Sequence, residues 1–205
     1  MIVYTAVFGK TDPLQIPTVR GECEYRCYTD QDITSDFWEI IRVEKKEEPA
    51  RASRILKAHP GFEVPHLWID ANFILRVDPI EILDAHPEEL VNFNHRDRVR
   101  ITDEAKEIVR LRKSPQDDVL RQLLAYKAEG FDVDNNPMRS LSCNGMNLKR
   151  PTERVRAFSS LLARQLGMYS DRDQMAWDYC VWKTGAVLGK FPGTFDNNPY
   201  TRYVF

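Results

Sequence analysis

The segment that decides the fold runs from Val64 to Val77, and its centre reads Leu67-Trp68-Ile69-Asp70-Ala71-Asn72-Phe73-Ile74-Leu75. Two apolar triplets flank the polar segment Asp70-Ala71-Asn72. A continuous apolar run of this kind predicts a strand buried on both faces, interrupted here at Asp70. Ligands of open α/β sheets bind beyond the carboxyl ends of the strands, so an acid at this position is well placed for a binding site.

The remainder of the chain alternates strand-like and helix-like patterns. Apolar or β-branched runs predict further strands at 2–8, 25–29, 37–43 and 90–94. Apolar residues at helical spacing, with proline, glycine or capping residues at the ends, predict helices at 49–59, 79–84, 115–130, 151–165 and 170–183, and one near Thr102 as its cap. The stretches 130–150 and 189–200 read as loop-rich. Strands with interspersed helices, followed by a mainly helical second half, are an α/β order.

Length and composition indicate one folded domain covering 1–205. The 205 residues are 42% hydrophobic and 29% charged, as in a packed globular protein. No stretch approaches the roughly 20 apolar residues of a membrane span, and the N-terminus lacks the basic start of a secretory signal, so we expect a cytoplasmic protein without a membrane span. The net charge of −2 argues against a protein whose whole surface binds nucleic acid. The oligomeric state is left open.

Asp70 and Asn72 are the first candidates for chemistry. Two polar groups at i and i+2 point the same way if the chain stays extended. One or two carboxylates together with substrate phosphates commonly hold Mg²⁺ or Mn²⁺, so this pair could form a metal site. The alternative is an ordinary turn between two strands, where both residue types are common.

Six blocks of sequence occur in the order of a known family. They are Val3 to Leu14, Cys27 to Asp30, Arg54 with Lys57 to Pro60, Leu67 to Asn72, His95 to Arg98, and Arg172 to Gln174. With them the chain resembles the TOD/MUCI-type glycosyltransferase-like proteins, placed near the GT-A glycosyltransferases. The resemblance spans roughly residues 3 to 180, and six ordered blocks are more specific than any one alone.

The resemblance implies a Rossmann-like GT-A fold that binds a nucleotide-sugar, with a mixed, mainly parallel central sheet and a helical C-terminal half. It also implies a divalent metal, Mn²⁺ or Mg²⁺, at the acidic motif that corresponds to Asp70 and Asn72. In GT-A enzymes this motif is typically Asp-x-Asp. This chain has Asn72 at the second acidic position, so it departs from that motif there.

Donor-binding roles can be assigned to residues of the first four blocks. Tyr4, Thr5 and Ala6 end the first strand, where backbone groups and an aromatic ring could hold the nucleobase, although Tyr4 could equally be core. Trp68 precedes the acidic motif. Arg54 and Lys57 lie three residues apart on one helix face and could both reach a pyrophosphate. The alternative is that both are ordinary solvated charges on the helix surface.

The last two blocks supply the remaining candidates. His95 and Arg98 follow a predicted strand and are donor-binding candidates, although a single histidine is more often structural. Arg172, Asp173 and Gln174 form the catalytic group. Inverting transfer needs a carboxylate to deprotonate the acceptor hydroxyl, and Asp173 is our choice of base, with Gln174 free to hydrogen-bond sugar or acceptor. In a retaining reaction Asp173 would orient the donor sugar. Capping of a helix by Ser170 is the alternative explanation.

These residues predict a glycosyltransferase that moves a sugar from a nucleotide-sugar to an acceptor hydroxyl on a glycan or protein. The basic stretch from Arg96 to Lys113 leaves a hydroxylated DNA base as a less favoured acceptor. A metal-dependent nucleotidyltransferase is the rival enzyme, although it would more often show several acids converging on two metals. A non-catalytic nucleotide-sugar-binding module is the rival outside enzymes.

Overall fold

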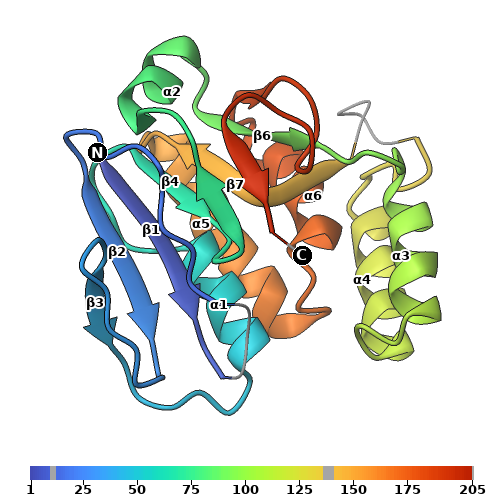
Figure 1. Cartoon of the computed structure of the whole chain (residues 1–205). Coiled ribbons are helices and arrows are strands. Elements are labelled where there is room, and N and C mark those ends of the chain that lie inside the picture. Colours follow the sequence, from blue (N-terminus) through green and yellow to red (C-terminus); the bar gives the residue numbers. More distant parts are fainter. Residues whose placement is uncertain (10–12, 136–140, 205) are drawn as a thin grey trace.

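The computed structural model describes residues 1–9, 13–135 and 141–204, and its centre is a seven-stranded sheet (Figure 1). The strand order is β3 (Glu39–Arg42), β2 (Glu24–Thr29), β1 (Ile2–Val7), β4 (His66–Ile69), β7 (Ser142–Lys149), β6 (Leu90–Asn94) and β8 (Leu188–Lys190). Every neighbouring pair is parallel except the two that β7 makes, with β4 and with β6. The expected mixed, mainly parallel α/β sheet is therefore confirmed.

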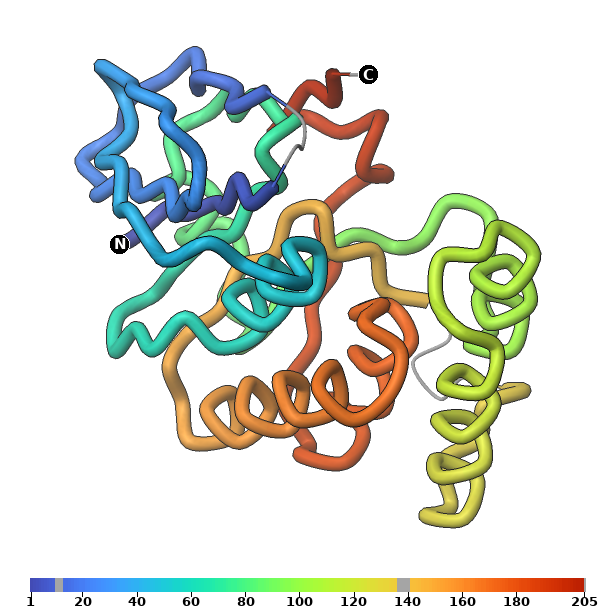
Figure 2. The backbone as a smooth tube through the Cα atoms, turned by 90° about the horizontal axis from the view of Figure 1, so that it is seen from below, coloured from blue at the N-terminus to red at the C-terminus, as the bar shows by residue number. Residues whose placement is uncertain are grey.

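Three helices cover one face of the sheet: α1 (Pro49–Ala58), α5 (Glu153–Met168) and α6 (Asp173–Thr184). Figure 2 shows them together, with the C-terminal segment on the other side of the sheet. That segment carries β9 (Thr201–Tyr203), which pairs with β5 (Phe73–Leu75) in a small antiparallel sheet. The helix α2 (Pro79–Ala85) follows β5, and α3 (Ile101–Arg110) and α4 (Gln116–Ala128) form a hairpin at the side of the molecule.

The strand β1 shows why an unbroken apolar run forms a central strand. All six of its residues are buried. Ile2, Tyr4 and Ala6 face the cluster that includes the apolar side of α1, while Val3 and Val7 face the cluster on the opposite side. Alternate side chains of a strand point to opposite faces, so a strand covered on both sides must be apolar throughout.

Some helix ends follow the local sequence. The Thr152 hydroxyl accepts a hydrogen bond from the backbone N–H of Val155 and caps α5, and Gly185 ends α6 in a left-handed conformation, with a φ of 66°. Two expectations were wrong. Thr102 lies inside α3, which begins one residue earlier, and Ser170 precedes Arg172, the residue that flanks the start of α6.

The loop-rich assignments were incomplete. The described part of 130–150 contains β7, the longest strand of the sheet. In the stretch 189–200 only the first two residues belong to a strand, β8, and β9 begins just after it. Asparagines and a glycine interrupt the apolar pattern of β7, and this composition reads as loop. None of the helices in the described ranges is long and apolar enough to cross a membrane.

Candidate active site

The acidic motif lies at the carboxyl end of β4, where the chain leaves the central sheet. Asp70 donates its backbone N–H to the carbonyl of Gly145 on β7 (2.8 Å), and its own carbonyl accepts from Phe73 (3.0 Å). The turn places Asp70, Ala71 and Asn72 between a strand of the large sheet and a strand of the small one. The chain is therefore not extended through the motif, and the same-side argument from i and i+2 does not apply.

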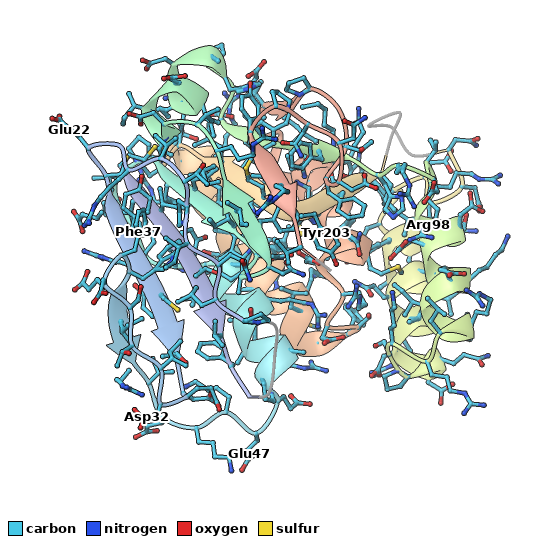
Figure 3. All side chains as sticks on the ribbon, in the orientation of Figure 1. Glu22, Asp32, Phe37, Glu47, Arg98 and Tyr203 are labelled. Atoms are coloured by element: carbon cyan, nitrogen blue, oxygen red, sulfur yellow. The ribbon has the colours of Figure 1, made fainter. Side chains whose placement is uncertain are left out.

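Two cavities meet at this turn. The larger, about 420 Å³, opens toward β9 and the segment before α3, where Tyr203 and Arg98 line it (Figure 3). The smaller, about 230 Å³, lies between the end of β1 and the start of α1. The residues that line both are Arg54, Lys57, Asp70 and Asn72. A volume of a few hundred cubic ångströms is typical of small-molecule sites.

The Lys57 ammonium lies at the centre of the site. Its Nζ is 3.1 Å from Asp70 Oδ1 and 3.2 Å from Asp173 Oδ2, and it lies 5.1 Å from the centre of the Trp68 ring. Only 8% of the Lys57 side chain is exposed. Burial works to lower the pKa of Lys57, but Asp173 and Asp70 outweigh it and hold the pKa above its ordinary value. Lys57 is therefore a fixed positive charge.

Asp173 is the buried carboxylate of this cluster, with 7% of its side chain exposed. Burial works to raise its pKa, but Lys57, Arg54 and Arg172 outweigh burial, and the pKa lies below its ordinary value. A carboxylate with a lowered pKa has a low proton affinity and is a weak base. The environment thus favours a role for Asp173 as a fixed negative charge rather than as a proton acceptor.

Two arginines complete the cluster. Arg54 forms an ion pair with Asp171, and both side chains are about four-fifths buried. Burial, and then the charge of Arg54, lower the pKa of Arg172. The Arg172 Nε has no hydrogen-bond partner among the described residues, and one Nη faces Gln174 Oε1 at 3.5 Å. Cations close together with an unsatisfied donor are an arrangement suited to an anion.

His95 and Arg98 line the larger cavity from the opposite side. The backbone N–H groups of Asp97 and Arg98 both donate to His95 Nδ1 (3.1 Å), and Arg98 Nη2 lies 2.8 Å from His95 Nε2, so both ring nitrogens face donors. Burial, followed by the Arg98 charge, lowers the pKa of His95 to about 4, so the ring is neutral at neutral pH. Arg98 Nε is 2.5 Å from Glu104 Oε2. Glu104 is 3% exposed, so it anchors this arginine besides lying in the first turn of α3.

Of the three candidates on the first strand, only Ala6 lines a cavity. Ala6 lines the smaller cavity together with Phe8. Tyr4 is fully buried and donates its hydroxyl to the Lys57 carbonyl (2.9 Å), so its ring is not available to a nucleobase, which corrects that expectation. Thr5 is also fully buried and lines neither cavity. Tyr4 instead holds the end of the helix that carries Lys57.

Several residues that line the site were not among the candidates taken from the sequence. Phe73, Tyr203, Asn144 and Gly145 all line the larger cavity. A Cβ on Gly145 would lie 2.8 Å from Phe73 Cζ and 3.4 Å from Asp70 Oδ2, so only glycine fits there without a shift of its neighbours. A glycine inside a strand indicates a close approach of another group or a bulge. Gly145 was therefore the one signal in the sequence that could have pointed to this part of the site.

The register of β7 changes at this point. Asn147 is opposite Asn92 on β6, but the next pair along the two strands is Cys143 with Phe93. The residues 144–146 therefore bulge from the ladder with β6, at the place where β7 meets the acidic turn. Bulges are often found beside active sites, where they redirect side chains.

The metal expectation can be examined from the oxygen atoms that are present. Asp70 Oδ1 accepts from Trp68 Nε1 (2.6 Å) and pairs with Lys57. The described residues contain no group of three or more His, Cys, Asp or Glu side chains suited to hold a metal. Magnesium binds its oxygen ligands at about 2.0–2.1 Å, so an ion between Asp70 and Asp173 would take the place of the ammonium. The residues do not fit a divalent ion bound between these two carboxylates, and the expected pair, Asp70 and Asn72, offers only one carboxylate.

Comparisons with known proteins place the chain in a family. One solved structure that resembles it is the apo structure of WbbM, a bifunctional glycosyltransferase, with 12% identity, a TM-score of 0.44 and 83% of this chain covered. The chain spans only 34% of that protein. No curated protein sequence matches the chain. Residues 24–197 match the family described as TOD1/MUCI70, glycosyltransferase-like domain, a range that begins after the first of the six blocks. The chain therefore belongs to the TOD1/MUCI70 glycosyltransferase-like family.

Proposed function

We propose that this protein transfers a sugar from a nucleotide-sugar donor to an acceptor hydroxyl on a glycan or protein. The observation that carries the proposal is the meeting of two cavities at Arg54, Lys57, Asp70 and Asn72, beyond the carboxyl end of β4. A nucleotide-sugar has two bulky ends joined by a diphosphate. Two cavities joined at a cationic centre have the matching shape and charge.

The smaller cavity would hold the nucleoside. Its lining includes Ala6, Phe8, Pro49 and Trp68, which offer apolar contact, and the binding of a base against such a surface is common in ligand pockets. The diphosphate would lie across the shared residues, within reach of Arg54 and of the unsatisfied Arg172 Nε. The sugar and the acceptor would occupy the larger cavity.

The charges of the cluster suit the departure of a diphosphate. As the bond between the anomeric carbon and the phosphate oxygen breaks, negative charge grows on the diphosphate and positive charge on the sugar. Lys57 and Arg54 are fixed cations that stabilise the leaving group, and Asp173 is a fixed anion beside the sugar. The acceptor oxygen forms the new bond to the anomeric carbon while its proton passes to the departing diphosphate. Gln174, which lines the larger cavity, can orient one of the hydroxyls involved.

Binding of nucleoside diphosphates tests the donor site. Titration calorimetry with UDP, GDP, CDP and ADP should show one of them binding clearly more tightly than its monophosphate. Charge-assisted hydrogen bonds contribute roughly 1.5–3 kcal/mol, so Arg54→Ala should weaken that binding by about tenfold or more. Arg121→Ala is the matched control, because Arg121 is an exposed arginine on α4 outside both cavities. Equal effects of the two variants would remove the proposed diphosphate site.

Product analysis tests the reaction. Release of the nucleoside diphosphate from a nucleotide-sugar supports transfer or its slow hydrolytic counterpart. Release of pyrophosphate from a nucleoside triphosphate would indicate a nucleotidyltransferase instead. Tight binding without turnover across a panel of glycan and protein acceptors would indicate a binding module.

The charge arrangement gives no support to a DNA acceptor. Within Arg96 to Lys113, Arg96, Arg98, Arg100 and Arg110 each form an ion pair with a nearby carboxylate. Paired arginines attract phosphates less strongly than a bare basic patch. Binding to DNA that falls steeply with salt would reverse this preference for a glycan or protein acceptor.

A further inference from the structure

We infer that the Lys57 ammonium takes the place of a divalent metal in this site, so that donor binding and sugar transfer need no metal ion. The inference concerns the same site as the proposed function. Its test by enzyme activity rests on that function, and its test by metal binding does not.

The geometry gives Lys57 the position that an ion would hold. Its Nζ lies between the carboxylates of Asp70 and Asp173, at 3.1 and 3.2 Å, with the Trp68 ring on another side. These two carboxylates come from different parts of the fold, the end of β4 and the start of α6. A cation that joins carboxylates from separate elements is the usual arrangement of a metal site, and here the cation is covalently part of α1.

The ammonium is held in place from its own helix. The Lys57 carbonyl accepts hydrogen bonds from the Tyr4 hydroxyl (2.9 Å) and from Lys149 Nζ (2.5 Å), and the Lys57 side chain is almost completely enclosed. Moving the ammonium away to admit an ion would require repacking of α1 against the sheet. Without such movement, a divalent ion would lie beside a like charge.

The neutral side chain of Asn72 also argues against a divalent ion at this site. Asn72 lines both cavities but carries a neutral amide where a second carboxylate would strengthen a divalent site. A single positive charge between two carboxylates needs less negative charge around it than a divalent ion does. Arg54 and Arg172 lie on the same side and add the positive charge that the diphosphate requires.

Binding of Mn²⁺, followed by electron paramagnetic resonance, tests the inference without any substrate. The wild-type protein should leave the signal of free Mn²⁺ unchanged at stoichiometric concentrations. Lys57→Ala leaves Asp70 and Asp173 without the ammonium, and it should bind one Mn²⁺ at least about tenfold more tightly than wild type. Adding Asp173→Asn to Lys57→Ala should abolish that gain.

The control and the second variant separate this effect from unfolding. Lys113→Ala removes an exposed lysine that lines the larger cavity away from the two carboxylates, and it should gain no Mn²⁺ binding. Circular dichroism checks the fold of every variant, and Lys57→Met, which keeps the apolar stem, replaces Lys57→Ala if the latter unfolds. The wild-type arm, together with the chelation measurement below, decides the inference even if both variants unfold. Stoichiometric Mn²⁺ binding by wild type that Asp70→Asn abolishes overturns it.

Chelation supplies the activity arm. Turnover of the wild-type protein should be unchanged in excess EDTA, and loss of turnover that Mn²⁺ restores contradicts the inference. If no nucleotide-sugar is turned over at all, the proposed function fails, and the Mn²⁺ measurements still decide whether Lys57 occupies the cation position.

Discussion

The buried Lys149 makes stability depend on pH in a direction that can be measured. Lys149 is fully buried at the end of β7, and its Nζ donates to the carbonyls of Lys57 (2.5 Å) and Ala58 (2.8 Å), the last residues of α1. Burial, followed by the nearby Lys57 charge, lowers the pKa of Lys149 from 10.5 to about 7. The ordinary value returns when the chain unfolds.

The sign follows from which state binds the proton. Between pH 7 and 10.5 the unfolded chain keeps a proton on Lys149 that the folded chain loses, so the free energy of unfolding rises with pH in this window. The rise approaches about 1.4 kcal/mol per pH unit and, for this group alone, on the order of 5 kcal/mol over the whole window. Below pH 7 both states hold the proton, and the group contributes no slope.

Urea unfolding of wild type and Lys149→Met between about pH 6 and 9 measures this contribution. Subtracting the variant from the wild type removes the other groups, including Cys180, whose raised pKa acts in the opposite direction above pH 9. The difference should grow in favour of the wild type by about 1 kcal/mol per unit above pH 7. Lys127→Met, at an exposed lysine, should show the wild-type slope. Equal slopes for wild type and Lys149→Met would refute the reasoning.

The remaining predictions concern the close fit of side chains. Gly145→Ala should lower the free energy of unfolding by about 1–3 kcal/mol and reduce turnover, because its Cβ would meet Phe73 at 2.8 Å. Gly167→Ala, where no atom lies within 4 Å, should instead stabilise α5 by about 0.5–1 kcal/mol; the same denaturation measurement compares the two. Thr152→Ala removes the cap of α5 and should cost about 0.5–2 kcal/mol in thermal unfolding, with donor affinity unchanged. Phe158→Ala empties a fully buried position and should cost about 3–5 kcal/mol, and a cost below 1 kcal/mol would mean that the core collapses around it.

The sequence predicts those parts of the fold whose pattern is local. The apolar run of β1 and the apolar stripe of α5 each predict their element, and the structure confirms them. The two triplets around Asp70 form β4 and β5, which belong to separate sheets and not to one interrupted strand. The strand β7 escapes prediction because its polar residues, such as Asn147, are buried by pairing with strands distant in the sequence. A local pattern carries no information about which distant strands will cover such residues.

The site is predictable to a similar extent. The spacing of Arg54 and Lys57 places both on one face of a helix, and both line the two cavities. The ion pairs of Lys57 with Asp70 and Asp173 depend on how α1, β4 and α6 pack, and no spacing within one segment reveals them. For the same reason, the buried state of Tyr4 could not be separated from a ligand-binding one in the sequence.

The bulge in β7 separates the shape of the site from the integrity of the sheet. On one side of it, Leu148 and Lys149 keep their pairing with both neighbouring strands, and on the other side Cys143 pairs with Phe93. A residue inserted beside Asn144 would change the wall of the larger cavity, while Met146 to Lys149 keep their pairs with β4 and Cys143 keeps its pair with Phe93. The shape of the larger cavity can thus be altered by changing the length of a few residues, with no redesign of the core around them.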